Sequence, residues 1–471
     1  MIVPLGIAAV AVGIVAAFFA RRLSLATAVM GTAIVGYVLG YDLWHTDFGP
    51  MPLTLDRLLL LVVGVLFVWR LWQREIASTT PTGADWAIAA TLGWLSLSWL
   101  TSGEPTMRLE TSPLFRLLVS FWFPAFLYAV LRHETFDGRT ARRFMTGLAA
   151  LGCYLAVTAV LETLGVWSLV FPRYIADPEL GLHFGRARGP ALNSVSLGVH
   201  LGVCACAAWL LIPRASRGMK LFWFLAVAAI CFATLITYTR STWIGLALAI
   251  VTIVGLQLPR RVRVPAFAAM LLGGVTLLAV GKDAIVGLER EDSGNVSAHS
   301  VQQRTAFAYV SMQMFADHPL LGVGFGRFYD TKLPYLTDRR QSFELESLRP
   351  LHHHNTFLSL LTETGLAGLF AYLAVLGSFG RVGWRLTHRE SIDPDTRRLG
   401  LLLLGTLAVY LPSAVFHDLT LVHSDQWLLF IVAGAGVGAL VNQMAAARAA
   451  RRVPLSPAVV WANPALKSLP K

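Results

Sequence analysis

Three residues in the second half of the chain could act together in catalysis. His354 and Asn355 end a long polar segment, at about residues 283–353, and an apolar run follows directly. Arg240 and Arg304 stand upstream, each at the end of a hydrophobic segment. A neutral imidazole can accept a proton, and a guanidinium group can hold phosphate oxygens through two parallel hydrogen bonds. These residue types favour transfer of a group from a diphosphate.

Two other histidines, His352 and His353, precede His354 directly. A metal site is one interpretation of the triplet. However, adjacent histidines rarely point at one ion, and no acidic pair with ligand spacing accompanies them. We therefore predict a structural or solvated role for His352 and His353, and no bound metal.

The segment after His354 is also specific. Gly365 follows eleven residues later, close to three helical turns, so a helix places it on the same face as His354. Gly365 and Gly368 form a small notch at which a second helix could pack closely, and packing alone would explain both. Glu363 is ionisable within an apolar run, which indicates a paired or functional group. Asn355 and Glu363 are candidate contacts to a donor or an acceptor.

Further arginines occur in Phe184-Gly-Arg186-Ala-Arg188-Gly-Pro190. Arg240 could simply reach the lipid headgroups, as arginines at membrane borders do. Hydroxyl residues surround it, however, and arginines are otherwise sparse on its side. Together with Arg304, these side chains could form a clamp for a diphosphate. Arg186 and Arg188 are therefore candidate contacts to a donor or an acceptor.

The composition predicts where these residues work. The chain is 55% hydrophobic and 14% charged, and its mean hydropathy is +0.61. Apolar runs long enough to cross a bilayer core of about 30 Å recur along almost the whole length. Backbone groups in lipid must be satisfied within the segment, so these runs must be helices. We predict an all-α polytopic membrane protein with about 12–13 transmembrane helices.

The sequence predicts thirteen membrane spans. They cover residues 2–20, 24–41, 55–72, 86–102, 113–131, 143–164, 191–212, 219–237, 241–257, 264–281, 355–379, 399–416 and 426–443. The first is predicted to be a retained span, since Arg21 and Arg22 follow it and no basic segment precedes it. The four cysteines, Cys153, Cys204, Cys206 and Cys231, lie in these runs and are expected to pack as small apolar residues.

Charges between the spans predict the orientation. Arginines and lysines gather in alternate connections, and the opposite connections are short and mixed or acidic. The basic connections include Arg21-Arg22, Arg70 with Arg74, Arg139 to Arg143, Arg214 to Lys220, Arg260 to Arg263, Arg381 to Arg398, and Arg448 to Arg452. The positive-inside rule places them in the cytoplasm. This orientation also explains most of the net charge of +12 without a nucleic-acid partner.

The same orientation places three polar segments outside: the 165–190 loop, the Arg240 corner and the 283–353 loop. Within the last loop, Asp292 to Ser300 resembles a mobile stretch. From Arg304 an amphipathic helix is expected, which His318-Pro319 would end. We divide the chain into N-terminal helices at 1–180, a catalytic membrane region at 181–443 that includes loop 283–353, and a disordered cytoplasmic tail at 444–471.

From about residue 180 to 370, the sequence resembles the O-antigen ligase and polymerase superfamily of membrane glycosyltransferases, which have a GT-C-like fold. The motifs are Thr-Arg240-Ser, Arg304 at the start of a helix, Asp317-His-Pro-Leu-Leu-Gly-Val-Gly324, and His354-Asn-x9-Gly365-x-x-Gly368. One departure is the Arg240 corner. Family members usually read Ser-Arg-Gly there, whereas this chain has Thr239 and Ser241.

The resemblance implies metal-independent, inverting transfer of a glycan from an undecaprenyl diphosphate carrier to an acceptor hydroxyl, without a cofactor. It further implies that His354 is catalytic and that Arg240 and Arg304 bind the diphosphate. The expected location is the inner membrane of a bacterium, with the active site on the periplasmic face. The acceptor could be a lipid or another glycan, so a ligase and a repeat-unit polymerase remain open. A transporter is a remote alternative. It would be expected to have ionisable residues in the middle of its spans and two related halves, whereas this sequence has few such charges and no repeated halves.

Overall fold

The computed structural model describes residues 23–46, 51–76, 79–103, 112–259, 261–265, 268, 293–338 and 345–452. These residues are mostly α-helical. Their only sheet pairs strands β1 (His45–Thr46) and β2 (Leu53–Thr54) in antiparallel register, with His45 opposite Thr54. The predicted all-α polytopic fold is confirmed.

Eight helices of this described part are long and apolar enough to cross a membrane. They are a composite helix of α5 (Pro113–Leu117), the π-helical turn η1 (Leu118–Trp122) and α6 (Phe123–Arg132), then α7 (Gly138–Thr163), α8 (Ser194–Leu211) with the short turn η4 (Ile212–Arg214), α9 (Arg217–Leu235), α10 (Arg240–Gln257), α15 (Thr356–Thr387), α16 (Pro394–Phe416) and α17 (His423–Arg452). Each matches a predicted span.

Three more helices precede them, again where spans were predicted: α2 (Leu25–Val38), α3 (Leu55–Trp72) and α4 (Gly83–Ser102). Helix α2 is short, and α3 carries Asp56, Arg57 and Arg70. The predicted spans 2–20 and 264–281 lie outside the described residues. Helix α17 continues to Arg452, beyond the predicted end of the last span at residue 443, so the start of the predicted disordered tail is helical.

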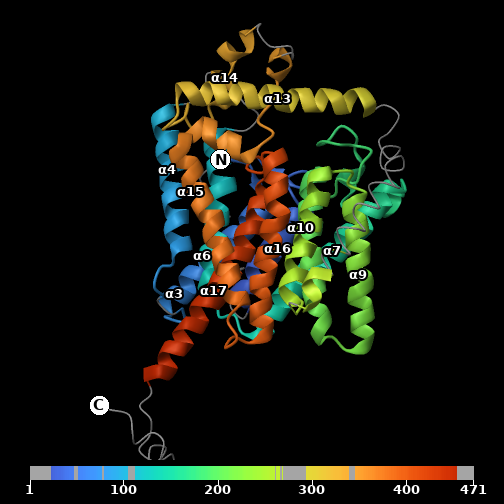
Figure 1. Ribbon diagram of the computed structural model, residues 1–471, viewed down its shortest axis with the longest axis vertical. Helices are drawn as coiled ribbons and strands as arrows, with labels where there is room; N and C mark the ends of the chain where they lie inside the picture. Colours follow the sequence, from blue (N-terminus) through green and yellow to red (C-terminus); the bar gives the residue numbers. More distant parts are fainter. Residues whose placement is uncertain are drawn as a thin grey trace, which may run out of the picture.

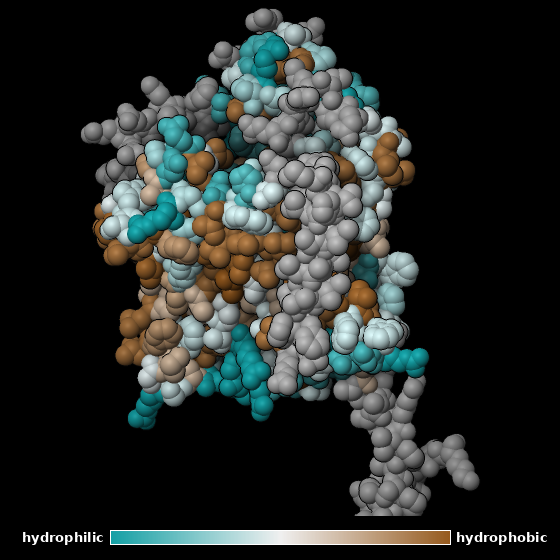
Figure 2. Space-filling model, turned by 180° about the vertical axis from the view of Figure 1, so that it is seen from behind, coloured by the Kyte–Doolittle hydropathy of each residue, from teal (hydrophilic) through white to brown (hydrophobic). Residues whose placement is uncertain are grey.

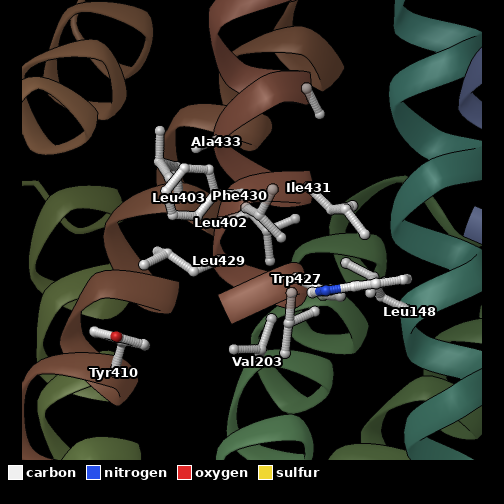
Figure 3. Close-up of a cluster of buried hydrophobic side chains, with 14 of the residues drawn as sticks. Leu148, Val203, Leu402, Leu403, Tyr410, Trp427, Leu429, Phe430, Ile431 and Ala433 are labelled. Carbon is white, nitrogen blue, oxygen red and sulfur yellow. The ribbon is translucent and has the colours of Figure 1, made fainter. Parts of the chain in front are cut away.

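Close packing among the helices depends on small residues and large apolar side chains. A Cβ on Gly245 of α10 would lie 2.8 Å from the Val409 carbonyl oxygen of α16, so only glycine permits this approach. Figure 3 shows part of the buried apolar core, to which Leu148 of α7, Val203 of α8, Leu403 of α16 and Trp427 of α17 contribute. All four cysteines are free and pack inside the bundle or at its edge, as expected.

The two ends of the bundle differ in charge, as the orientation argument requires. At one end, the Asp395 carboxylate pairs with Arg142, Arg214 and Arg398, which come from three connections predicted to be cytoplasmic. At the other end, α13 (Ser293–Asp317) lies across the tips of the helices (Figure 1). Between the ends, the face seen in Figure 2 shows a broad apolar band, which fits a bilayer core.

The α13 side also carries a small cap with its own core. Its elements are α13, α14 (Phe328–Thr331), η5 (Leu333–Thr337) and η6 (Leu345–Leu348). The apolar face expected for α13 is confirmed, because Phe307, Val310 and Met314 are buried against Phe328. Helix α13 ends at Asp317, before His318-Pro319, as expected. It begins at Ser293, however, so the prediction of a mobile stretch up to Ser300 is wrong from that residue on.

Helix α15 is interrupted at Gly365, whose φ is +65° and ψ −168°. The Pro319–Gly324 turn fills the interruption: the amides of Val323 and Gly324 donate to the carbonyls of Thr362 and Glu363, and the Leu366 amide donates to the Pro319 carbonyl. A Cβ on Gly365 would lie 2.2 Å from the Leu320 carbonyl oxygen. The expected close packing at Gly365 therefore exists, but its partner is the backbone of a loop instead of a helix.

Gly368 lies one turn after the interruption. A Cβ there would lie 1.9 Å from the Thr364 hydroxyl oxygen and 3.1 Å from the Trp94 ring of α4. The Trp94 indole in turn donates to the Thr364 carbonyl, directly before the interruption. Both glycines thus allow the same feature: α15 is interrupted, and the turn that ends at Gly324 packs into the interruption. Two of the sequence motifs therefore meet at this point.

Candidate functional site

His354 stands at the end of the polar segment, just before α15. The Asn355 side-chain oxygen accepts hydrogen bonds from the Phe357 and Leu358 amides, at 2.8 and 2.9 Å, and so caps the helix. Asn355 therefore fixes the backbone beside His354, and its contact with a donor or an acceptor stays a prediction. Thr356 adds a second anchor: its hydroxyl donates to the His417 carbonyl and accepts from the Leu419 amide.

The surroundings of His354 favour its neutral form. Its ring packs edge to face against Phe307 of α13, with 5.1 Å between centroids. Burial lowers the pKa of His354, the Arg304 charge lowers it further, and the Asp418 carboxylate acts in the opposite direction. Burial contributes more to the lowered pKa than the arginine does.

Arg240 and Arg304 come together from separate segments. Arg240 is the first residue of α10, and Arg304 projects from α13, where its guanidinium lies 5.7 Å from the centre of the Phe416 ring. Burial lowers the pKa of Arg304, and the positive charge of Arg240 lowers it further. Two guanidinium groups that repel each other beside His354 form a place where an anion would be stabilised.

Two further histidines, which the sequence analysis did not single out, complete this cluster. Burial and the Arg304 charge lower the pKa of His417 to about 3. The pKa of His183 is also lowered, with a contribution from the Arg186 charge, although the His183 side chain is exposed at the surface. Both imidazoles are thus neutral hydrogen-bonding groups at pH 7. His417 follows α16 at a polar corner between two apolar helices, and this position was the signal available in the sequence.

Arg186 and Arg188 have different environments. Arg186 is exposed and acts electrostatically on His183. Arg188 is 1% exposed, and its guanidinium donates to the carbonyls of Ile175, Asp177 and Leu180. Arg188 is therefore a structural residue of its loop, in place of the predicted contact with donor or acceptor.

Glu363 has a buried partner that the sequence analysis missed. Arg116 of α5 donates through Nη1 to both Glu363 oxygens, at 2.8 and 3.1 Å. Its Nη2 donates to the hydroxyls of Ser359 and Thr420 and lies 3.5 Å from an Asp418 oxygen. The expectation that Glu363 is paired is confirmed. Arg116 could have been found as the one basic residue inside the predicted span 113–131, which needs a carboxylate partner.

The remaining histidines of the triplet also differ from each other. His352 is exposed beside the Tyr329 ring. His353 is 4% exposed and stacks on Phe328 with 3.5 Å between ring centroids, so a solvated role is wrong for it. Nearby, the buried Lys332 ammonium donates to the carbonyls of Leu348 and Leu351. These contacts hold the segment that precedes His354 against the cap.

The comparisons with known proteins converge on one family. Residues 224–373 match a family model described as O-antigen ligase, and this segment includes Arg240, Arg304, His354 and the interrupted helix. The chain is also similar to the exopolysaccharide production protein ExoQ of Rhizobium meliloti (strain 1021). The two are 26% identical over 366 residues, which cover 74% of this chain and 76% of that protein.

Proposed function

This chain belongs to the O-antigen ligase superfamily, and from that premise we propose that it transfers a glycan from an undecaprenyl diphosphate carrier to an acceptor hydroxyl. Membership makes it a membrane protein of polysaccharide synthesis. The observation that supports the donor chemistry is the cluster of Arg240, Arg304 and His354, whose charges act on one another although they come from three segments.

In this proposal, the two arginines bind the diphosphate. Their forks donate to the phosphate oxygens and stabilise the charge that builds up there as the glycosidic bond breaks. The repulsion between Arg240 and Arg304 is relieved when the dianionic group lies between them. The polyprenyl tail then extends along the apolar surface of the bundle.

His354 acts as the general base. The acceptor oxygen attacks the anomeric carbon, and the bond from that carbon to the diphosphate oxygen breaks, with its electron pair leaving on the lipid diphosphate. The acceptor hydroxyl proton passes to the free nitrogen of His354 and later to water. The diphosphate is a good leaving group and needs no general acid, and attack from the opposite side inverts the anomeric centre. General-base assistance of this kind contributes about 10²–10⁴-fold.

A polymerase that extends one carrier-linked repeat with another is the second candidate. It uses the same donor chemistry, and the similar Rhizobium protein, described as an exopolysaccharide production protein, favours it. The two candidates differ only in the acceptor to which the glycan becomes attached.

The test is a reaction of the full-length protein in lipid nanodiscs with an undecaprenyl-diphosphate-linked oligosaccharide. We expect release of undecaprenyl diphosphate together with a lengthened carrier-linked glycan for a polymerase, or a glycan on a different acceptor for a ligase. Nanodiscs without protein are the control. If undecaprenyl diphosphate is released no faster than in that control, the proposed function is wrong.

A further inference from the structure

We propose that the cavity between α5 and the corner joining α16 to α17 binds the acceptor, as one neutral sugar residue with a hydroxyl directed toward His354. This inference rests on the proposed function and adds the place and chemical class of the second substrate. The cavity measures about 140 Å³, and Phe115, Arg116, Tyr329, His352, Glu363 and Thr420 are among the residues that line it.

The cavity is separate from the groups assigned to the donor. Arg240, Arg304, His183 and His417 are absent from its lining. Its lining includes His352, two residues before His354, and Thr420 and Leu421 of the corner that follows α16. In that corner, His417 interacts with Arg304, whereas Asp418 and Thr420 contact Arg116. His354 contacts Phe307, one turn after Arg304 on α13, and Asp418 acts on its pKa, so His354 lies close both to Arg304 and to the Arg116 network that lines the cavity.

The charges around the cavity exclude a second diphosphate site. One guanidinium, that of Arg116, faces two carboxylates, those of Glu363 and Asp418. An anion would meet more negative than positive charge there, whereas a neutral polyol would find both donors and acceptors. Arg240 and Arg304 offer the opposite balance, so the cavity would favour a neutral glycan and the arginine cluster an anionic carrier.

The shape and lining fit a sugar. Planar rings from Phe115, Tyr329 and His352 provide apolar faces, and the hydroxyl of Thr420 with the Arg116–Glu363 pair provides hydrogen-bonding groups. Pockets for drug-sized ligands usually enclose about 300–1,000 Å³. A space of half that size or less suits a single residue at the end of a glycan, with the rest of the chain outside.

Photo-crosslinking tests this assignment directly. The probe is the host's own polysaccharide repeat unit, released from its carrier and tagged at the reducing end, so that it can accept but cannot donate. Leu421 lines the cavity and is 40% exposed, which allows Leu421→p-benzoylphenylalanine in the full-length protein. The matched control places the same photoreactive residue at Leu169, which is exposed on a different outer loop.

We expect at least tenfold more crosslinked probe at position 421 than at 169, with competition by excess untagged repeat unit. Adding Arg304→Ala should leave this signal within twofold, because the probe lacks a diphosphate. Equal crosslinking at both positions would overturn the inference. Loss of the signal with Arg304→Ala would instead assign the cavity to the donor.

Kinetics provide a second measurement. Tyr329→Ala should raise the KM for the tagged acceptor about tenfold and leave the KM for the lipid-linked donor within twofold. Tyr335→Ala is the matched control, since Tyr335 is a tyrosine of the same cap that bonds to Asp317, away from the cavity. A parallel rise in both KM values, or no rise in either, contradicts the inference. Failure of the proposed function would appear differently, as a wild-type protein that forms no product.

Discussion

The imidazole of His354 is subject to opposing influences from its neighbours. Burial and Arg304 lower its pKa, and Asp418 raises it. A base must be neutral before it accepts a proton, and the neutral form dominates above its pKa. Because the folded protein lowers that pKa, we expect the acid limb of the profile of log(kcat/KM) against pH to fall below about 6.5, the usual value for histidine.

Asp418→Asn tests the origin of that limb. Removing the carboxylate removes the charge that raises this pKa, so the limb should move to still lower pH. The value of kcat should fall, because a weaker base assists less. Asp317→Asn, which changes a carboxylate of the outer cap, should leave the limb in place. A limb that moves to higher pH in Asp418→Asn would contradict this account of His354.

Arg304 is predicted to act on the donor through its planar fork. Loss of a charge-assisted hydrogen bond costs about 1.5–3 kcal/mol, so Arg304→Ala should raise the donor KM about 10–100-fold. Arg304→Lys should recover only part of that loss, because a point charge cannot replace two parallel hydrogen bonds. The control is Arg349→Ala, an exposed arginine of the same cap that pairs with Glu346. Full recovery by lysine would show that charge alone matters.

The sequence was informative about residues whose type is unusual for their surroundings. His354, Arg240 and Arg304 are polar groups at the edges of apolar runs, and the structure brings them together. His183, His417, Asp418 and Arg116 were missed because their importance comes from contacts between segments far apart in the chain. Arg188 has the expected residue type, but backbone carbonyls of its own loop occupy its guanidinium group. The Asn355 side-chain oxygen caps α15, which its position before the apolar run did not reveal.

The interruption of α15 links two elements that appear as separate motifs in the sequence. The Pro319–Gly324 turn donates to, and accepts from, the backbone groups that the break at Gly365 exposes. Unpaired backbone groups are costly in an apolar environment, so the turn and the broken helix depend on each other. The same contact joins the outer cap, which carries Arg304, to the helix that begins beside His354.

Gly365→Ala should break this link. Its Cβ would meet the Leu320 carbonyl at 2.2 Å, and its φ of +65° disfavours any side chain. We expect a loss of roughly 1–3 kcal/mol in the free energy of unfolding and a large loss of activity, as measured by thermal unfolding and transfer assays.

Gly377→Ala provides the matched control in the same helix, where, among the described residues, no atom apart from the adjacent backbone of α15 lies within 4 Å of the added Cβ. There the change should be neutral or stabilise by about 0.5–1 kcal/mol, as alanine does within helices. Equal stability of the two variants would show that the interruption tolerates a side chain. The sequence alone favoured a notch between helices, because a Gly-x-x-Gly pattern looks alike in a continuous and in a broken helix.

The whole molecule separates its charges between the two ends of an apolar bundle. Arginines from three connections meet Asp395 at one end, and the cluster around His354 lies at the other. Apolar runs and loop charges were sufficient to predict most helices and their alternation. They could not predict which helices touch, nor that α13 lies across the bundle, because these features depend on contacts between distant side chains.

Labelling of single cysteines tests the predicted orientation. The experiment uses a variant whose four native cysteines are replaced by alanine, in cells whose outer membrane has been removed and whose inner membrane is intact. In these cells, Thr337→Cys should react with a membrane-impermeant maleimide. Ser391→Cys, on the Asp395 end, should react only after the inner membrane is permeabilised. Both positions are exposed, so accessibility within the fold is matched. The reverse pattern would place His354 in the cytoplasm and contradict the proposed use of a donor outside it.

The most direct measurement is the transfer rate of His354→Ala beside its binding of the lipid-linked donor. His388→Ala serves as the control, since His388 is an exposed histidine at the opposite end of α15. The account predicts that kcat falls about 10²–10⁴-fold in His354→Ala, while donor affinity stays within twofold and His388→Ala remains active. A His354→Ala protein that transfers the glycan at the wild-type rate would contradict the central claim.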